Sequence, residues 1–420
     1  MSGNQIAVLL LDLVAVFAVC GLLGSLVAKL GQPPVIGELL GGVLLGPTVL
    51  GSWSGVLFPD AVRPTLGAFG NVGVALFMFA LGAEFDGSAV RTRLRHAWVV
   101  AAGAMLVPFA LGVGTALLLP VLGVGQRGSP TAFVLFLGVA LSITAFPVLA
   151  RILDDRGLVR TGVGRLALTV AALCDVLAWS ALAVVVAIVS GSGGHVWQVL
   201  LLVPLVVVLR FAVGPVLRLV LLRLGPRQEN AVVVLLLAGA LACGAATELM
   251  GLHFIFGAFV FGLLAARSGP GPLVARVRGR VLEISRFFLP VYLVVAGLQV
   301  DIAFDPASLV LLGVVLFAAT AGKTLGAFGA AKACRLRTRP ATALAVLLNT
   351  RGLTELIVLS TGLQLGVIDR RQYSVMVLMA LATTAATGPA LAWLARRGNR
   401  LGEDPFELDA VGMPVGGARR

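Results

Sequence analysis

Apolar segments long enough to cross a bilayer recur along almost the whole of this 420-residue chain. A transmembrane helix needs about 20 mostly apolar residues. We predict about thirteen spans, at residues 6–29, 35–50, 66–84, 97–119, 132–150, 162–190, 196–222, 230–249, 252–266, 284–300, 308–331, 341–363 and 372–395. The pattern indicates an all-α polytopic membrane protein, with one transmembrane domain over residues 1–400 and a short tail over 401–420.

The composition excludes a soluble protein. Apolar residues make up 59% of the chain and charged residues 12%, with a mean hydropathy of +1.03. Soluble domains are about 45–50% apolar and about 25% charged. The net charge of +13 comes from basic residues in the breaks between spans, which is a pattern of membrane topology and not of a phosphate-binding face. We therefore expect the lipid bilayer, and no nucleic acid, as a partner.

The distribution of Lys and Arg predicts the orientation. Residues 1–5 carry no basic residue, so the first apolar run is a span and not a cleaved signal peptide. With the N-terminus outside and the C-terminus cytoplasmic, the outer segments hold only Arg63, Arg127, Arg370 and Arg371. Basic clusters then face the cytoplasm, as the positive-inside rule requires. The scarcity of lysine beside abundant Ala, Val, Leu and Gly is a composition associated with GC-rich bacterial genomes, so we expect a bacterial cell (inner) membrane.

An odd number of spans allows two inverted repeats of six, joined by the span at 196–222. The short, Gly-rich span 35–50 matches 252–266, and the spans at 132–150 and 341–363 both contain polar, helix-interrupting motifs. The span at 162–190 then pairs with the last span, which has Thr383-Thr384 at its centre.

Asp175 lies near the middle of the span at 162–190. A carboxylate at that depth costs roughly 2.5–3.5 kcal/mol on insertion scales, and is usually tolerated only beside water or a partner charge. Our hypothesis is that Asp175 binds a cation and a proton in turn.

Pro147 predicts a break in the span at 132–150. Proline removes a backbone donor and clashes with the preceding turn, so we expect the helix to open near Thr144. The freed carbonyls, with the hydroxyls of Ser142 and Thr144, are hard oxygen ligands of the kind an alkali cation prefers.

The span at 341–363 contains the polar run Asn349-Thr350-Arg351-Gly352, followed by Glu355. Arg351 stays charged and must be paired inside a membrane, most simply with Glu355. Gly352 can break the helix. The pair either holds a second broken helix or takes a direct part in ion binding.

Lys323, like Arg351, is a basic residue within a span. The sequence Gly322-Lys323-Thr324 lacks the first glycine of a phosphate-binding loop, since Phe317 stands there, and we expect no cofactor. A buried lysine needs a carboxylate partner or must give up its proton. Asp175 is the natural partner.

Glu38 and the pair Thr383-Thr384 are candidates for lining an access route. The alternative for Glu38 is a hydrogen bond to a neighbour. The glycines beside it, Gly37 and Gly41, form a small-xxx-small pair that allows close helix packing.

Taken together, these motifs resemble the monovalent cation:proton antiporter-2 family, which includes plant cation/proton exchangers and bacterial sodium or potassium/proton antiporters. The matching stretches are Gln32–Gly46, Ala140–Arg151, Asp175 with Ala178-Trp179, Phe288–Leu298, Lys323 and Asn349–Val358. The resemblance implies the sodium/proton antiporter fold, in which the two broken helices cross, and a homodimer. It also implies a dimerisation part at about 6–84 and 230–300, a moving core at about 97–190 and 308–395, and a linker helix at 196–222.

By this resemblance Asp175 binds the cation (Na⁺ or K⁺) and the proton, with Lys323 as its charge partner. Related members have Asp-Asp or Asn-Asp where this chain has Cys174-Asp175, so Cys174 lies in the binding site and leaves the stoichiometry open. Pro147, Asn349, Thr350, Arg351 and Glu355 would support the broken helices.

The predicted function is antiport of Na⁺ or K⁺ against H⁺ by alternating access, with cation and proton competing for Asp175. The alternative is a cation channel, or a proton-coupled exporter of an organic ion, on the same fold. We do not expect an enzyme: an intramembrane aspartyl protease needs two opposed membrane aspartates, and Asp12 lies near the outer end of the first span.

Overall fold

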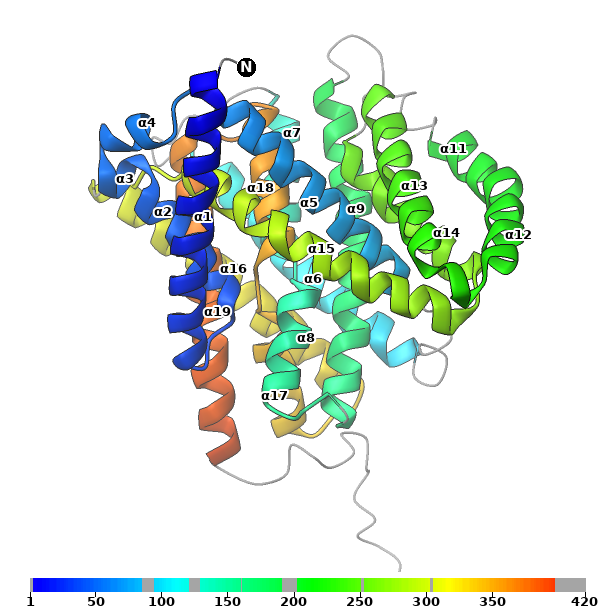
Figure 1. The fold of residues 1–420 in the computed structure, drawn as a ribbon. Helices are drawn as coiled ribbons and strands as arrows, with labels where there is room; N and C mark the ends of the chain where they lie inside the picture. Colours follow the sequence, from blue (N-terminus) through cyan, green and yellow to red (C-terminus); the bar gives the residue numbers. More distant parts are fainter. Residues whose placement is uncertain are drawn as a thin grey trace, which may run out of the picture.

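The computed structural model describes residues 3–84, 94–120, 129–159, 161–190, 202–250, 253–302 and 305–396. Within these ranges every regular element is helical (Figure 1). The predicted tail at 401–420, the Arg-rich segment 91–93 and the start of the predicted linker helix lie outside them.

The first half of the chain forms nine helices within the described residues: α1 (Gly3–Lys29), α2 (Pro34–Leu45), α3 (Pro47–Leu50), α4 (Trp53–Leu57), α5 (Arg63–Glu84), α6 (Leu94–Leu118), α7 (Pro130–Ser142), α8 (Phe146–Asp155) and α9 (Gly162–Ser190). The connecting region follows as α11 (Leu202–Val208), a π-helical turn η1 (Leu209–Val213), α12 (Gly214–Leu224) and a 3₁₀ turn η2 (Pro226–Gln228). The second half forms α13 (Glu229–Leu249), α14 (Phe254–Ser268), α15 (Gly271–Gly297), α16 (Pro306–Ala333), α17 (Thr338–Leu348), α18 (Leu353–Gln364) and α19 (Arg370–Arg396).

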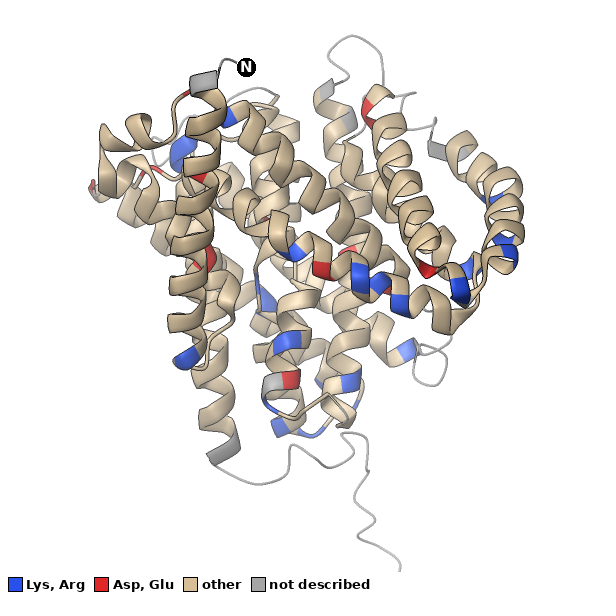
Figure 2. Cartoon of the chain, in the orientation of Figure 1, with Lys and Arg blue, Asp and Glu red and all other residues tan. Residues whose placement is uncertain are grey.

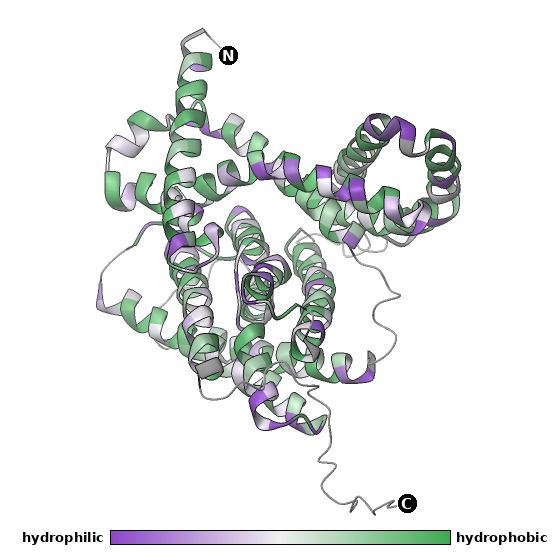
Figure 3. Ribbon diagram, turned by 60° about the horizontal axis from the view of Figure 1, so that its bottom comes forward, coloured by the Kyte–Doolittle hydropathy of each residue, from purple (hydrophilic) through white to green (hydrophobic). Residues whose placement is uncertain are grey.

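Each predicted span overlaps one or more helices in the described residues, and residues 196–201 of the predicted span 196–222 lie outside them. Of the described helices, nine are long and apolar enough to cross a membrane, and α17 with α18 forms a tenth such unit, bent by 43°. The short predicted spans at 35–50 and 252–266 correspond to α2 and α14, which are 12 and 15 residues long. Most of the helical ribbon in Figure 3 has the colour of hydrophobic residues, as expected for membrane-spanning helices.

One helix extends well beyond its predicted span. We expected a span beginning at residue 284, but α15 begins at Gly271. The charges that we took as the end of the span continue along the helix because they are paired at its surface: Arg276 and Arg280 contact Glu229, and Arg278 contacts Glu84.

The helices form two groups by their packing. The α5–α15 group contains α1, α2, α5, α13, α14 and α15, and the α6–α16 group contains α6, α7, α8, α9, α16, α17, α18 and α19. The most extensive contact in each group is between α5 and α15 or between α6 and α16. In each pair, one helix comes from the first predicted repeat and the other has the corresponding place in the second repeat. In Figure 1, α11 and α12 lie at one edge beside α13 and α14.

Glycines mark the inverted repetition. A Cβ on Gly37 would overlap the backbone of Leu23 in the preceding helix, and a Cβ on Gly257 would overlap the backbone of Cys243 in the same way. These positions belong to α2 and α14, the two segments that the sequence matched with each other. Contact between backbones is the usual use of small residues in membrane helix packing.

Lys and Arg, blue in Figure 2, lie mostly in the middle and lower parts of the view, with a few near the top. The hydrophobic residues exposed on α1, such as Leu10, Leu11 and Val14, lie on the outside of the bundle. A water-soluble surface would not carry an apolar helix face of this length.

Gly326 provides a test of the packing. A Cβ there would overlap the Gly103 carbonyl oxygen, where α6 and α16 touch, whereas a Cβ on Gly329 of the same helix would meet nothing within 4 Å. We expect Gly326→Ala to destabilise the protein by about 1–3 kcal/mol, the usual cost of overpacking. The thermal midpoint of the detergent-solubilised protein should fall for Gly326→Ala and not for Gly329→Ala. Equal midpoints for both variants would contradict the α6–α16 contact.

Candidate functional site

The first broken helix opens where proline predicted. α7 ends at Ser142 and α8 begins at Phe146, so Ile143, Thr144 and Ala145 are not helical. Pro147 occupies the first turn of α8, where a missing N–H costs nothing because that donor would have no partner within the helix.

The second break lies at residues 349–352, between α17 and α18. Gly352 is at the point where α8 approaches: a Cβ there would lie 2.5 Å from Cγ2 of Val148. A larger residue here would have to displace Val148, so glycine allows the two breaks to approach closely.

The two breaks cross and hydrogen-bond to each other. The Ala145 N–H donates to the Thr350 carbonyl at 3.0 Å, and the Thr144 hydroxyl donates to the Leu348 carbonyl at 3.0 Å. Non-helical backbone inside a membrane is tolerated only when it is buried in protein or faces water. Here each break satisfies backbone groups that the other has freed.

Arg351 joins the second break to the end of α7. Its Nη1 donates to the Ala140 carbonyl at 3.1 Å, and its Nη2 donates to the Leu141 carbonyl at 2.7 Å. Nη1 also contacts Oε1 of Glu355 at 2.7 Å, and both side chains are fully buried. The ion pair expected from the sequence is therefore formed, and its arginine caps carbonyls that α7 leaves open at its C-terminus.

Thr384 of α19 holds the same break from the other side. Its hydroxyl accepts from the Arg351 N–H at 2.9 Å and donates to the Arg351 carbonyl at 2.7 Å. Thr383 bonds instead to carbonyls of its own helix, at Met379 and Ala380. Both threonines are buried. We had considered them for an access route, and the structure places Thr384 in contact with the broken backbone.

Lys323 enters the crossing from α16. Its side chain is fully buried, and its ammonium donates to the Ser142 carbonyl and, at 2.7 Å, to the Thr144 hydroxyl. The Ser142 hydroxyl itself donates to the carbonyls of Met105 and Gly138. The direct ion pair that we expected between Lys323 and Asp175 is not formed in this structure, because neutral oxygens of the first break hold the ammonium.

Asp175 of α9 lies beside the crossing and is 3% exposed. Neither of its carboxylate oxygens has a hydrogen-bond partner. The ammonium of Lys323 and the backbone N–H of Phe146 lie within electrostatic reach, and Phe146 is the first residue of α8. The positive end of a helix dipole thus faces the acid. The neighbouring Cys174 is also buried, beside Thr144 and Lys323.

Glu38 lies against α1 and not at the crossing of the two breaks. It is half-buried on α2, and a Cβ on Gly24 would lie 3.6 Å from its Cγ, so its side chain lies against α1. Between α2 and the second break there is a cavity of about 10 Å³, lined by Val35, Ile36 and Gly352 among others. That is at the lower limit for a single water. The structure does not bring Glu38 together with Asp175.

Sequence reasoning missed the contacts made by the two tyrosines, which are the only ones in the chain. The Tyr292 hydroxyl of α15 donates to the Leu356 carbonyl of α18, and the Tyr373 hydroxyl of α19 donates to the Ala296 carbonyl of α15. Both bonds link the α5–α15 group to the α6–α16 group. The rarity of tyrosine in an apolar chain was the only signal available.

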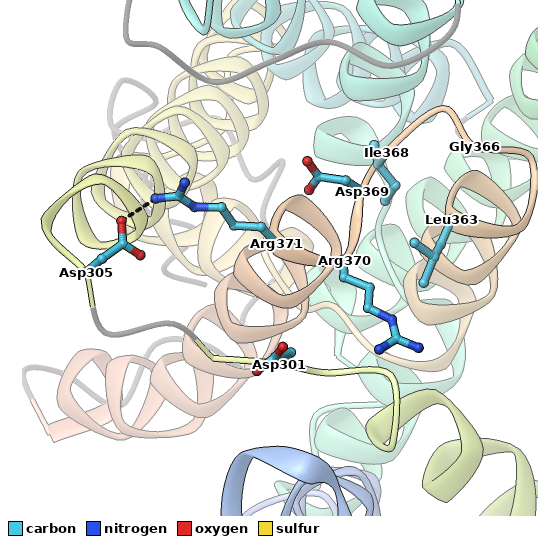
Figure 4. Close-up of a pocket in the computed structure, with 8 residues that line it drawn as sticks. All are labelled: Asp301, Asp305, Leu363, Gly366, Ile368, Asp369, Arg370 and Arg371. Atoms are coloured by element: carbon cyan, nitrogen blue, oxygen red, sulfur yellow. Dashed lines mark hydrogen bonds and ion pairs between the residues drawn. The ribbon is translucent and has the colours of Figure 1, made fainter. Parts of the chain in front are cut away.

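A second missed feature is a cavity of about 540 Å³ near the starts of α16 and α19, which we call the α16–α19 pocket (Figure 4). Asp305 and Arg371 pair along one edge of it at 2.5 Å. The Ser308 hydroxyl, which donates to Asp305 at 2.6 Å, holds the pKa of this carboxyl below its ordinary value. The Asp305 carboxylate therefore stays ionised to a lower pH than an aspartate without these partners. We had used Arg371 only for topology.

One contact at the opposite end of the bundle also joins the two groups: the Gln32 amide, between α1 and α2, donates to the Ala385 carbonyl of α19 at 3.1 Å. Next to it, Arg156, after α8, donates to the Gly388 carbonyl at 3.3 Å, a bond within the α6–α16 group.

The fold and the crossing together define the class. Inverted repeats with crossed, discontinuous helices and a buried acid at the crossing are typical of secondary transporters. The chain belongs to the transmembrane sodium/hydrogen exchanger family, whose model matches residues 14–397. It is thus an integral membrane protein of a monovalent cation:proton antiporter family, as the sequence motifs predicted.

Its relatives carry related names. Cation/H(+) antiporter 18 of Arabidopsis thaliana is 38% identical over 410 residues, which are 94% of this chain and 50% of the plant protein. Na(+)/H(+) antiporter NhaS4 of Synechocystis is 33% identical, covering 93% of this chain and 97% of its own. K(+)/H(+) antiporter 1 of Saccharomyces cerevisiae is 30% identical, covering 92% and 46%. The chain therefore spans about half the length of the plant and yeast relatives.

A solved structure shares the fold. The sodium proton antiporter MjNhaP1 from Methanocaldococcus jannaschii superposes with a TM-score of 0.64 over 95% of this chain and 99% of its own, at 16% sequence identity. The predicted fold class is confirmed.

Thr384 and Thr383 make a matched pair for testing the crossing. Thr384→Val removes the hydroxyl that satisfies both backbone groups of Arg351, and should destabilise the protein by about 1–3 kcal/mol, the cost of leaving buried polar groups unpaired. Thr383→Val removes only bonds to carbonyls of its own helix and should cost less. Thermal unfolding in detergent measures both. A larger loss for Thr383→Val would mean that Thr384 does not hold the break.

Proposed function

We propose that this chain exchanges a monovalent cation, Na⁺ or K⁺, for protons by alternating access, and that cation and proton compete for Asp175. The observation that supports this most directly is the state of Asp175: it is buried beside the crossed broken helices, and neither oxygen has a hydrogen-bond partner. The names of its relatives, which include sodium and potassium antiporters, agree with both candidate cations.

The competition follows from electrostatics. An ionised carboxylate in a low-dielectric site is costly unless a charge or hydrogen bonds compensate it. Asp175 can be compensated either by a proton or by a bound cation, and each excludes the other from the same oxygens. Occupation by one therefore expels the other, which couples the two fluxes without further machinery.

Lys323 adds a second form of competition. Its ammonium contacts the Ser142 carbonyl and the Thr144 hydroxyl, which are neutral oxygens of the kind that alkali cations prefer. A cation bound between Asp175 and Thr144 would replace the ammonium at Thr144. Lys323 then either withdraws or loses its proton, and in the second case a further proton is coupled to each cation.

Alternating access requires the two helix groups to move relative to each other. We propose that the α5–α15 group is a dimerisation scaffold, with boundaries near 6–84 and 230–300, and that the α6–α16 group, near 97–190 and 308–395, is the moving core. The hydrogen bond from Gln32 to the Ala385 carbonyl of α19 would hold the two groups together at one end in this conformation, and Arg156 binds α19 within the moving core. The apolar face of α1 would meet lipid or a second copy of the chain.

The proposed setting is a bacterial cell membrane with the N-terminus outside. The basic residues between spans support this orientation through the positive-inside rule. The α16–α19 pocket would then face outward, and Gln32 and Arg156 would face the cytoplasm.

Everted membrane vesicles with a pH-sensitive dye test the function. Adding Na⁺ or K⁺ to respiring vesicles that contain the protein should release protons and dequench the dye. Asp175→Asn should abolish this response, because the amide cannot exchange a proton for a cation. Asp154→Asn, which alters an exposed carboxylate at the end of α8, should leave it unchanged.

Two outcomes would contradict the proposal. Undiminished exchange by Asp175→Asn would exclude Asp175 as the shared site. Cation flux without any counter-movement of protons would indicate a channel.

A further inference from the structure

Trp179 lies one helical turn beyond Asp175 on α9. Residues four apart project from the same face of a helix, with Cβ atoms about 5–6 Å apart. The Trp179 side chain is 4% exposed, and its ring packs edge-on against Phe256 of α14, with ring centroids 6.4 Å apart and planes at 84°. Trp179 thus lies next to the proposed ion site, where the α6–α16 group meets the α5–α15 group.

The indole N–H of Trp179 is buried and has no hydrogen-bond partner. An indole N–H can only donate, and a buried tryptophan usually finds an acceptor for it. The Phe256 ring that packs against it has no oxygen or nitrogen to accept this bond. The ring is therefore held in place by packing while its single polar atom remains unsatisfied.

The unpaired groups on this face of α9 are complementary. Trp179 supplies a donor without an acceptor, and Asp175, one turn away, supplies two acceptor oxygens without donors. Side chains one helical turn apart are usually separated by a distance that two consecutive hydrogen bonds of about 2.8 Å, one on each side of a shared water, can bridge. A single water between the two residues would satisfy both, since it can accept from the indole and still donate to the carboxylate or bind a cation through its oxygen.

We propose that Trp179 positions one water molecule that the cation retains when it binds at Asp175. This inference rests on the proposed function. The cation would take its ligands from Asp175, from the oxygens of the first break and from this water, whose orientation the indole N–H fixes. Protonation of Asp175 does not need the water, so Trp179 contributes to cation binding and not to proton binding.

The test measures initial exchange rates in proteoliposomes over a range of Na⁺ and of K⁺ concentrations at fixed pH. Trp179→Phe keeps an aromatic ring against Phe256 and removes only the N–H. It should raise the KM for the cation about tenfold, the effect of one hydrogen bond to a charged cluster. The maximal rate should stay within about twofold of wild type.

Two further variants separate the hydrogen bond from the packing. Trp179→His restores an N–H donor and should bring the KM back toward the wild-type value. Phe256→Leu disturbs the ring contact but leaves the indole intact, and should leave the KM near wild type. If Trp179→Phe does not fold, Trp179→Met serves as the second variant without a donor.

An unchanged KM in the folded donor-free variant would overturn the proposal. So would an equal rise in KM for Phe256→Leu, because the role of Trp179 would then be packing alone. Either result can occur while Asp175→Asn still abolishes exchange, so failure of this inference is distinguishable from failure of the proposed function.

Discussion

The structure depends on satisfying backbone groups that two helices release in the middle of a membrane. Lipid offers no hydrogen bonds, so a break at this depth persists only if protein replaces each lost bond. The two breaks here do this for each other, through Ala145 with Thr350 and Thr144 with Leu348. Two more side chains satisfy backbone groups at the breaks: Arg351 in the second break binds a carbonyl at the end of α7, and Thr384 of α19 accepts from the Arg351 N–H.

This scaffold separates two kinds of buried charge. Arg351 and Glu355 contact each other directly, and the arginine also binds carbonyls at the end of α7. Such a pair is costly to break, because removing one partner leaves an uncompensated buried charge. Asp175 and Lys323 differ, since the lysine is held by neutral oxygens and the acid has no hydrogen-bond partner. The first pair suits a structural role, and the second arrangement leaves a carboxylate available for exchange.

Local chemistry allowed both breaks to be predicted from the sequence. Pro147 cannot lie inside a continuous helix without cost, and Gly352 beside a charged residue indicates an interruption. The Arg351–Glu355 pair followed because an arginine in a membrane must have a partner. The correspondence of α2 with α14 followed from their short, Gly-rich sequences, which the backbone contacts of Gly37 and Gly257 explain.

Tertiary contacts could not be predicted in the same way. Thr384 was placed at the centre of the last span and considered for an access route, but its bonds to Arg351 depend on how α19 packs against the second break. The direction of Glu38 toward α1 and the neutral ligands of Lys323 depend equally on the packing of distant helices. The extension of α15 beyond its predicted span was missed, since its arginines pair with Glu229 and Glu84, which lie far away in the sequence.

Competition between cation and proton at one carboxylate is tested most directly by the pH dependence of cation affinity. Purified protein in proteoliposomes would be assayed for the KM of Na⁺ or K⁺ over several pH values, together with the maximal rate. Competition predicts that, on the acid side, KM rises about tenfold for each unit by which the pH falls, while the maximal rate at saturating cation stays constant. A KM independent of pH, with the maximal rate alone changing, would show that the proton acts at a different site and would contradict a shared role for Asp175.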